Sequence, residues 1–542
     1  MLGARPLLRK AARRPLAAAL ALAAIAVSIY VAAAPLFAAH YPPITDLPFH
    51  GATIAIIRHY FDPAYHFREQ FWFDFTQNPY WSLHVLGALF ALVTPVVLAT
   101  KLASALLLLM LPAGLALFFH GLKKSPLLGL FGLPLVWTSL AHWGFINFVA
   151  AIGLFAATVG ATLLLLDKPS HGRGLLLAVL LFLVFFTHIF RFPFALAAVA
   201  GTTLVMFPAT RRIAPVILPT LPALVVGVAW WVTRKQTPTE DLGPLTPHFE
   251  RLNEIPGHLF SGLAGRTELT LARQALRLGT VAISALAVLR AIELSRRELP
   301  AKELRWLACG TVLSLGLSAA FLAMYLTLPL QIGVWWSVYP REIVPAILMA
   351  LGLAPNLPRS SLLRAPILGL VAYAAAAQAS YAARAYASFE ADTRDFQHIL
   401  KKIPLGPKLG YLVFDRQHPR FTAPAFIHLP AWVQAEKGGW LSFHFVGWDV
   451  WPIRYRKNAP SVPPPTPLRF EWMPERFDLK TRGKFFDWLL VRKAGPPDPR
   501  FAQEPDLRLV EHAGAFWLYR RDPAATPASP APPAPPRNPR AP

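Results

Sequence analysis

The sequence predicts a polytopic α-helical membrane protein with a C-terminal α/β domain outside the membrane. Hydrophobic residues make up 55% of the 542 residues and charged residues only 15%, whereas about a quarter of the residues in soluble globular domains are charged. Apolar runs of about 20 residues, the length that crosses a bilayer as a helix, recur as far as residue 382. After residue 383 the pattern changes to short strands and turns, which indicates a separate small domain.

About eleven segments are apolar enough to be membrane spans. The first is too long for the apolar region of a signal peptide and further spans follow at once, so we expect it to be retained. The predicted spans are Pro15–Phe37, Val97–Phe119, Pro126–Leu140, Phe145–Leu166, Leu175–Thr187, Ile189–Phe207, Ile213–Val232, Leu276–Ile292, Leu304–Leu326, Ile343–Ala354 and Leu362–Ala382.

Loop charges predict the orientation and settle one ambiguous segment, Trp81–Val97. The basic N-terminus should be cytoplasmic because cytoplasmic loops collect Lys and Arg. If Trp81–Val97 does not cross, the other basic loops also fall on that side, so we expect this segment to be a juxtamembrane or half-inserted helix at the outer face. These basic groups are Arg5, Arg9, Lys10, Arg13 and Arg14, then Lys123 and Lys124, Lys168 and Arg173, Arg211 and Arg212, Arg296, Arg297 and Lys302, and Arg359 and Arg364.

The outer side then holds the first loop at 38–96, turns at 139–147 and 187–192, loops at 233–273 and 327–342, and everything after 383. The net charge of +24 is explained by the basic cytoplasmic loops. No basic stripe interleaved with aromatic residues is present, so we expect no nucleic-acid partner. The single cysteine, Cys309, cannot form an intrachain disulfide.

The outer C-terminal domain is predicted at 384–522, after a transmembrane domain at 1–383. Its Trp-rich segment Trp432–Trp451, with Trp440 and Trp448, could contact a glycan or fill the domain core. Residues 523–542 are rich in Pro and Ala and should be a disordered tail. The predicted elements are a helix at Tyr386–Ile403 and strands at Leu409–Asp415, Leu441–Val446, Phe486–Arg492, Leu507–Glu511 and Ala515–Arg520, the last two forming a hairpin around His512–Gly514.

Asp46 and His50 are the first candidates for catalysis. They lie four residues apart and would project from one face of a helix that begins near Asp46. In the alternative interpretation, Asp46 only caps this helix and His50 packs beside it.

Other outer turns carry further ionisable residues to the same membrane face. A single histidine or tryptophan there is typical of an interfacial anchor, but a set confined to one face favours a pocket. A carboxylate could act as a general base and arginine could stabilise a phosphate, which together fit transfer from a lipid-linked phosphate. We expect Arg341 and Arg191 to bind the phosphate, and His142, His188, Tyr339 and Glu342 to line the pocket. No cofactor is certain; His and Asp could ligate a divalent metal, although no zinc-type spacing is present.

The layout resembles the GT-C superfamily of integral membrane glycosyltransferases, and most closely its uncharacterised bacterial members. The segments that carry the resemblance are TDLPFHGATI at Thr45–Ile54, WGFINF at Trp143–Phe148, FFTHIFRF at Phe185–Phe192 and YPREIVP at Tyr339–Pro345. The resemblance implies a polyprenyl-phosphate sugar donor, an extracytoplasmic acceptor and a bacterial inner membrane location. It also implies that Asp46 is the catalytic aspartate of the first loop and that Arg341 is the late-loop arginine that meets the lipid phosphate.

The sequence departs from this family in two places. Many members have a second acidic residue in the first or second outer loop, whereas the second turn here offers His142, and Asp62, Glu69 and Asp74 have no clear counterpart. No WWDYG-like motif is present. Two other functions therefore stay open, a transporter or flippase and a noncatalytic subunit of cell-envelope assembly.

Overall fold

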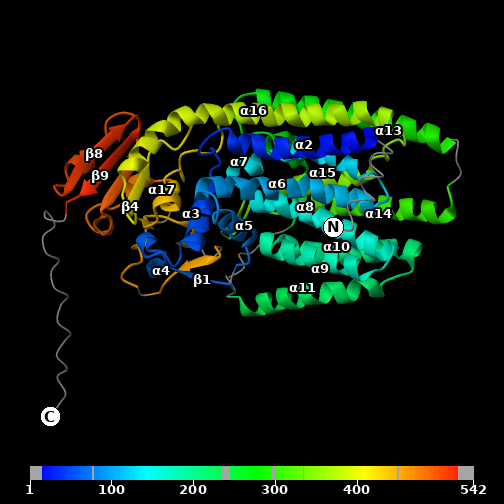
Figure 1. The fold of residues 1–542 in the computed structure, drawn as a ribbon, viewed down its shortest axis with the longest axis horizontal. Helices are drawn as coiled ribbons and strands as arrows, with labels where there is room; N and C mark the ends of the chain where they lie inside the picture. Colours follow the sequence, from blue (N-terminus) through cyan, green and yellow to red (C-terminus); the bar gives the residue numbers. More distant parts are fainter. Residues whose placement is uncertain are drawn as a thin grey trace, which may run out of the picture.

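The computed structural model describes residues 15–75, 78–234, 245–295, 299–333, 335–447, 451–457, 459–467, 469–497 and 499–522. Long helices lie side by side in a bundle, and the C-terminal domain sits on one end of it (Figure 1). One hydrophobic core continues from Val31 in the bundle to Leu518 in the domain. The predicted N-terminal basic cluster, Arg296, Arg297, Trp448 and the tail lie outside the described residues.

The multi-pass membrane architecture is confirmed, since eight helices among the described residues are long and apolar enough to cross a bilayer. The other three of the eleven predicted spans are helices too short to be counted among the eight: η2 (Pro126–Leu135), a 3-10 helix that contains Pro134; α9 (His171–Thr187); and α15 (Ile343–Ala350), followed by η5 (Leu351–Leu353). The eight long helices are α2 (Pro15–Phe37), α6 (Val96–Gly121), α8 (Ile146–Asp167), α10 (Arg191–Thr210), α11 (Ala214–Thr233), α13 (Thr267–Ser295), α14 (Ala301–Thr327) and α16 (Ser361–Lys402).

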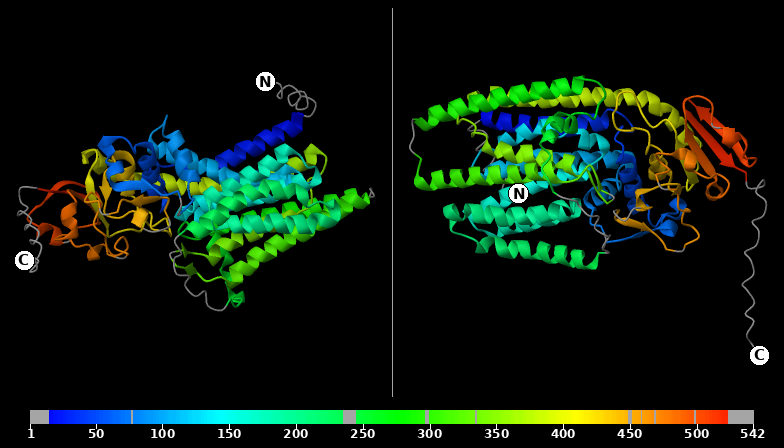
Figure 2. Two further views of the ribbon diagram at one scale, coloured as in Figure 1. Left: turned by 90° about the horizontal axis from the view of Figure 1, so that it is seen from below. Right: turned by 180° about the vertical axis from the view of Figure 1, so that it is seen from behind.

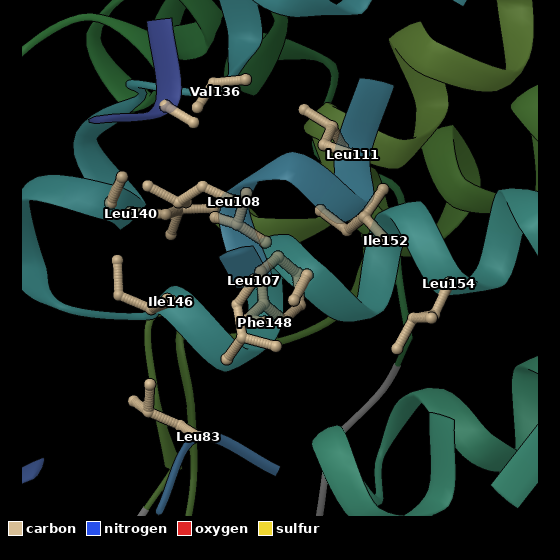
Figure 3. Close-up of a cluster of buried hydrophobic side chains, with 14 of the residues drawn as sticks. Leu83, Leu107, Leu108, Leu111, Val136, Leu140, Ile146, Phe148, Ile152 and Leu154 are labelled. Carbon is tan, nitrogen blue, oxygen red and sulfur yellow. The ribbon is translucent and has the colours of Figure 1, made fainter. Parts of the chain in front are cut away.

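Helices α6 and α8 form the centre of the bundle. A Cβ atom built on Gly114 of α6 would lie 1.8 Å from the carbonyl oxygen of Gly153 in α8, so only glycine allows this approach. Around this contact, leucines of α6 such as Leu108 and Leu111 pack with Ile152 and Phe148 of α8 (Figure 3).

The predicted cytoplasmic loops meet at one end of the bundle, the end far from the C-terminal domain. Lys123 pairs with Asp167 at 2.8 Å, and Arg212 donates to the Asp167 carbonyl oxygen at 2.7 Å. Lys124 donates to the carbonyl oxygen of Gly352 at 2.6 Å. Loops that were grouped only by charge are therefore neighbours in space.

The predicted outer segments gather at the opposite end. Between Trp81 and the start of α6 at Val96 the chain forms the nine-residue helix α5, too short to cross a bilayer, which agrees with a segment that does not cross. The short elements at this end are α3 (Leu47–Arg58), η1 (Pro63–Tyr65), α4 (Phe67–Gln70), β1 (Phe71–Phe73), α5 (Ser82–Phe90), α7 (Ser139–Trp143), η3 (Phe249–Glu254), α12 (Ile255–Leu259), β2 (Gln331–Ile332), β3 (Trp335–Trp336) and η4 (Tyr339–Glu342).

The C-terminal domain contains a five-stranded sheet with the order β5-β4-β7-β9-β8. Strands β5 and β7 pair parallel with β4, and β9 pairs antiparallel with β7 and β8. The elements are β4 (Lys408–Val413), α17 (Ala431–Lys437), β5 (Trp440–Leu441), η6 (Phe445–Gly447), β6 (Ile453–Tyr455), η7 (Pro474–Arg476), η8 (Arg482–Phe485), β7 (Trp488–Arg492), α18 (Pro499–Ala502), β8 (Leu507–Ala513) and β9 (Phe516–Arg521).

Two predictions for this domain are wrong in detail. The strand expected at Leu441–Val446 ends at Leu441, because the chain turns where His444 accepts a hydrogen bond from the Val446 amide. The helix expected at Tyr386–Ile403 is not separate but is the end of α16, which runs unbroken across the predicted boundary between residues 383 and 384. Figure 2 shows α16 passing from the bundle into the domain.

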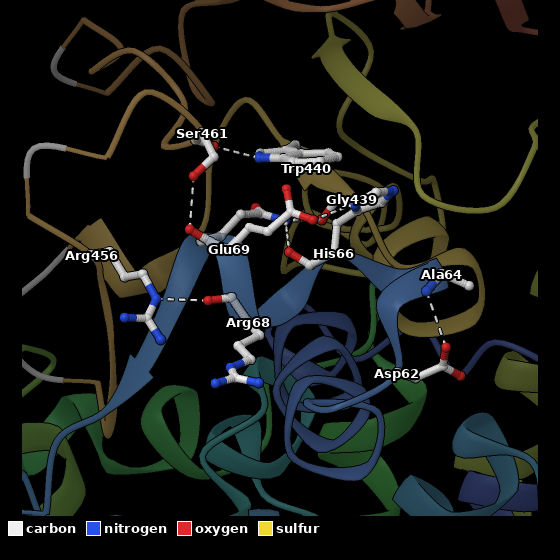
Figure 4. A network of polar contacts seen from close by, with 10 residues as sticks. Asp62, Ala64, His66, Arg68, Glu69, Gly439, Trp440, Arg456 and Ser461 are labelled. Carbon is white, nitrogen blue, oxygen red and sulfur yellow. Dashed lines mark hydrogen bonds and ion pairs between the residues drawn. The ribbon is translucent and has the colours of Figure 1, made fainter.

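The first outer loop and the C-terminal domain are joined by backbone and side-chain contacts. β1 pairs antiparallel with β6. Ser461 donates to the carbonyl oxygen of Glu69 at 2.8 Å, and Arg456 donates to that of Arg68 at 2.7 Å (Figure 4). The loop and the domain therefore form one layer over the outer end of the bundle.

Candidate functional site

A cavity of about 830 Å³ lies between the outer end of the bundle and the C-terminal domain. The wall formed by the first outer loop and the end of the bundle carries the polar side chains Asp46, His50, Tyr80, His84, Asn147, His188 and Arg341, and the domain wall carries Arg416, His428, Arg469 and Glu471. Aromatic rings, including Trp143, Trp336 and Trp472, fill much of the remaining surface. Polar groups that converge in a mostly apolar hollow are typical of a ligand site.

Asp46 is held at the cavity by the turn that contains Gly144. The Asp46 amide donates to the Trp143 carbonyl oxygen at 3.1 Å. Gly144 has φ of +104°, and a Cβ atom there would lie 2.9 Å from the Asp46 Cβ, so glycine is needed for this turn. Asp46 precedes α3, but its side chain makes no capping hydrogen bond. The capping interpretation therefore does not account for its carboxylate.

The Asp46 carboxylate instead pairs with His428 of the C-terminal domain. His428 Nδ1 lies 3.1 Å from Asp46 Oδ1 and 3.1 Å from the Thr45 carbonyl oxygen. The side chain of His428 is 6% exposed and that of Asp46 is 19% exposed. This contact joins the two walls of the cavity.

His50, the second candidate for catalysis, lines the cavity in contact with another histidine, His84. His84 Nδ1 donates to the Tyr80 carbonyl oxygen at 2.9 Å, and His84 Nε2 lies 3.0 Å from His50 Nδ1. Burial lowers the pKa of His84 to about 4 and lowers that of His50 well below its usual value. Both rings are therefore neutral at pH 7, with His50 Nδ1 donating to His84 Nε2.

Arg341 lies in the cavity among buried polar atoms that have no hydrogen-bond partner within the described residues. Its guanidinium donates to the Trp336 carbonyl oxygen at 2.6 Å and lies 4.1 Å from the centre of the Phe145 ring. Burial lowers the pKa of Arg341 only to about 10, so it is a cation at pH 7. The unpartnered atoms are Arg341 Nε, the Tyr80 hydroxyl, His188 Nδ1 and Asn147 Oδ1. Such atoms are costly to bury unless a ligand or water pairs with them.

His188 lies at the cavity wall, as does Arg341. Burial, followed by the nearby Arg341 and Arg191 charges, lowers the pKa of His188 well below its usual value. Burial also raises the pKa of Tyr80, which keeps its hydroxyl a donor. The cluster thus offers one cation and several neutral polar groups.

Arg191 and Glu342 do not line the cavity. Arg191 Nη1 donates to Glu342 Oε2 at 2.7 Å and Nη2 donates to Oε1 at 2.5 Å, which uses both carboxylate oxygens. The side chains are 2% and 7% exposed. The predictions of a phosphate contact for Arg191 and a lining position for Glu342 are not met, because the two charges neutralise one another inside the protein.

His142 and Tyr339 also lie elsewhere. His142 Nδ1 bonds the Tyr386 hydroxyl at 2.9 Å, and its ring lines a separate, very small pocket with Glu268. Tyr339 donates to Glu254 at 2.9 Å. Both side chains are occupied in packing the outer loops together.

The domain wall contains residues that sequence reasoning missed. Arg416 donates to the Trp472 carbonyl oxygen at 3.1 Å, and burial raises the pKa of Glu471. Of the tryptophans considered for glycan contact, Trp451 lines the cavity, whereas Trp432 is fully buried. The sequence feature that could have predicted this wall is a short run of charged and aromatic residues, Arg469, Glu471 and Trp472.

No three His, Cys, Asp or Glu side chains in the described part of the chain are grouped so that they could hold a metal ion. The sequence-based suggestion of a divalent metal thus finds no ligand set among these residues.

The fold is similar to that of two crystal structures of ArnT from Cupriavidus metallidurans, a GT-C membrane glycosyltransferase. The apo structure matches with a TM-score of 0.52 and 11% identity, over 93% of this chain and 98% of that chain. The structure bound to undecaprenyl phosphate matches with a TM-score of 0.51 and 14% identity, over 92% and 97%. No protein-family model and no curated protein matches this sequence. The chain thus shares its fold with ArnT, which agrees with the GT-C-like architecture expected from its layout.

Proposed function

We propose that this protein is a membrane glycosyltransferase that moves a sugar from a polyprenyl-phosphate donor to an extracytoplasmic acceptor. The observation that carries the proposal is that one cavity holds both the Asp46 carboxylate and the Arg341 guanidinium. One neighbour in fold is bound to undecaprenyl phosphate, which supports a donor of this chemical class.

In the proposed reaction, the Arg341 cluster binds the donor phosphate. The guanidinium fork matches phosphate oxygens, and the Tyr80 hydroxyl is a second donor beside it. The bond between the anomeric carbon and the phosphate oxygen breaks, and its electron pair stays on the polyprenyl phosphate. Arg341 stabilises the charge that develops there.

The pair formed by Asp46 and His428 receives the proton of the acceptor hydroxyl. The acceptor oxygen then forms the new bond to the anomeric carbon. Trp143, Trp336 and Trp472 offer flat apolar faces for the sugar rings. Neutral His50 can hydrogen-bond a sugar hydroxyl without adding charge.

The positive-inside bias supports an inner-membrane orientation with the basic loops in the cytoplasm and the cavity outside. Contacts such as that of Lys124 with the Gly352 carbonyl oxygen join the loops at the basic end. The ionisable cavity residues lie at the other end of the bundle, which favours an enzyme over a transporter, whose ionisable residues would lie near mid-span.

The test is a profile of lipid-linked sugars in a strain that lacks the protein. We expect one polyprenyl-phosphate sugar to accumulate, and plasmid-borne wild type to remove it. Asp46→Asn and Arg341→Ala should fail to do so at normal expression. The matched controls are Asp62→Asn, an exposed acid of the same outer loop, and Arg420→Ala, an exposed arginine of the domain. Unchanged lipid-linked sugars, or full complementation by Asp46→Asn, would refute the proposal and favour a noncatalytic subunit.

A further inference from the structure

The hydrogen bonds of His428 fix the proton on one ring nitrogen. Both groups that lie 3.1 Å from Nδ1, the Thr45 carbonyl oxygen and Asp46 Oδ1, are acceptors. Nδ1 must therefore carry the hydrogen, and in the neutral ring Nε2 carries the lone pair. A histidine held by a carboxylate at one nitrogen, with the other nitrogen open, has the geometry of a general base.

His428 Nε2 has no hydrogen-bond partner among the described residues, and the ring lines the cavity. The ring centre lies 4.8 Å from that of Phe49, and 5.1 Å from that of Phe445. These apolar neighbours restrict the ring and shield it from bulk water. The open nitrogen and the restricted ring together direct the lone pair to whatever occupies the cavity.

The position of His428 is fixed by helix packing. It lies three residues before α17, and its carbonyl oxygen accepts from the Ala431 amide at 2.9 Å. Trp432 of α17 lies so close to Gly51 of α3 that a Cβ atom on Gly51 would be 2.4 Å from the indole. Asp46 and His428 lie just before these two packed helices, whose contact holds the two residues together.

We propose that His428 Nε2, and not an Asp46 oxygen, accepts the proton of the acceptor hydroxyl, and that Asp46 is the positioning residue of this dyad. The inference rests on the proposed function. As the acceptor oxygen bonds the anomeric carbon, its proton moves to Nε2 and the electron pair of the broken bond leaves with the phosphate. The imidazolium formed is stabilised by the Asp46 carboxylate and later releases its proton to water.

Glu471 of the domain wall and His444 interact electrostatically with His428, and the same cavity also holds the cations Arg341, Arg416 and Arg469. Burial raises the pKa of Glu471, which favours its neutral form, and burial lowers the pKa of His444 to about 3, so that ring is neutral. His50, the other imidazole near Asp46, is a poor proton acceptor because burial and His84 lower its pKa. Asp46 is therefore the charged partner that assists His428.

The first experiment separates the dyad from direct catalysis by Asp46. In His428→Asn the amide nitrogen replaces Nδ1 and can keep the hydrogen bond to Asp46, but no base remains at the Nε2 position. We expect its transfer rate to fall about 100-fold or more, with undecaprenyl-phosphate binding unchanged. Added imidazole should restore part of the activity of His428→Ala. If Asp46 were the base, His428→Asn would keep near-wild-type activity and imidazole would have no effect.

The control is His418→Asn, in a matched His–Asp pair away from the cavity. His418 Nε2 bonds Asp392 at 2.8 Å, and its Nδ1 accepts from the Arg420 amide at 3.1 Å. We expect this variant to retain activity.

The second experiment does not depend on glycosyl transfer. The lone pair of a neutral imidazole nitrogen attacks diethyl pyrocarbonate. The intact, reconstituted protein is labelled with this reagent, and mass spectrometry of its peptides then locates the adduct. In wild type, His428 should react several-fold faster than His418, whose ring nitrogens are both occupied. The reaction rate of His428 should fall several-fold in Asp46→Asn but not in Asp62→Asn. An unreactive His428, or equal rates in both variants, overturns the dyad.

The two experiments distinguish the two proposals. If His428 reacts as expected but no polyprenyl-phosphate sugar is consumed, the proposed function fails and the dyad stands. If sugar is transferred by His428→Asn at the wild-type rate, the dyad fails and the proposed function stands.

Discussion

Replacing Arg191 by methionine should strongly destabilise the protein, because it leaves the buried Glu342 carboxylate without its partner. Two charge-assisted hydrogen bonds, at 2.7 and 2.5 Å, are lost. At about 1.5–3 kcal/mol each, they sum to about 3–6 kcal/mol. Breaking a buried ion pair by removing one partner costs about 3–5 kcal/mol, which agrees with that sum. The guanidinium also lies 4.6 Å from the centre of the Phe148 ring, a further contact that methionine replaces in part.

The assay is the free energy of unfolding in mixed micelles, measured by denaturant titration. Arg290→Met is the matched control, since Arg290 pairs with Glu293 at 2.8 Å but both side chains are about a quarter exposed, at 23% and 27%. That variant should cost less than about 1 kcal/mol. The double variant Arg191→Met/Glu342→Leu should recover most of the stability lost in Arg191→Met, because no unpaired charge remains.

Undecaprenyl-phosphate binding by the double variant tests the structural role of Arg191. We expect binding equal to wild type, since the Arg191 guanidinium faces Glu342 and not the cavity. The reasoning is refuted if Arg191→Met lowers the free energy of unfolding by no more than Arg290→Met does. It is also refuted if the double variant is stable but no longer binds undecaprenyl phosphate. Loss of binding in a stable double variant would indicate that Arg191 contacts the phosphate.

Three further predictions concern packing and pH. Gly51→Ala should lower both stability, by about 1–3 kcal/mol, and transfer activity, because its methyl group displaces Trp432 and the His-bearing segment beside it; a stable, active variant contradicts this. Gly153→Ala should cost about 1–3 kcal/mol in the same titration, since its Cβ meets backbone atoms of α6 at 2.1 Å, whereas Gly279→Ala, with open space around it in a helix, should not lower stability. Burial lowers the pKa of His444 from 6.5 to about 3. As pH falls below 6.5, His444 is therefore protonated in the unfolded chain but stays neutral in the folded protein. The free energy of unfolding consequently decreases, by up to about 1.4 kcal/mol per pH unit. His444→Gln should have a shallower slope between pH 6 and pH 4, and an unchanged slope would show that this histidine is not responsible.

Most of the bundle could be predicted from the sequence because a membrane span is a local property. A run of apolar residues is sufficient, and eight predicted spans are long helices in the structure. The predicted end of the last span is wrong, because a helix can continue into a segment that is no longer apolar. Hydropathy falls after Ala382, so the sequence suggested two helices, but the Ala-rich residues that follow continue the helix to Lys402.

The candidate site could be predicted only in part, because half of it depends on contacts between distant residues. Asp46 and Arg341 stand out locally, as charged residues beside apolar runs. His428 lies 382 residues from Asp46, and nothing in its own surroundings distinguishes it from a packed histidine. Arg191 and Arg341 both precede apolar segments, and only the fold shows that one is neutralised by Glu342.

Helix α16 has a consequence for how the outer domain is carried. Its 42 residues rise about 1.5 Å each, so it is a strut of about 63 Å that begins in the bundle and packs against β8 and β9. A flexible linker would let the domain drift and tilt above the bilayer. A continuous helix instead sets both its height and its rotational angle, since every residue added or removed would shift the domain by 1.5 Å and turn it by about 100°. Natural length variation between span and domain should therefore come in whole helical turns.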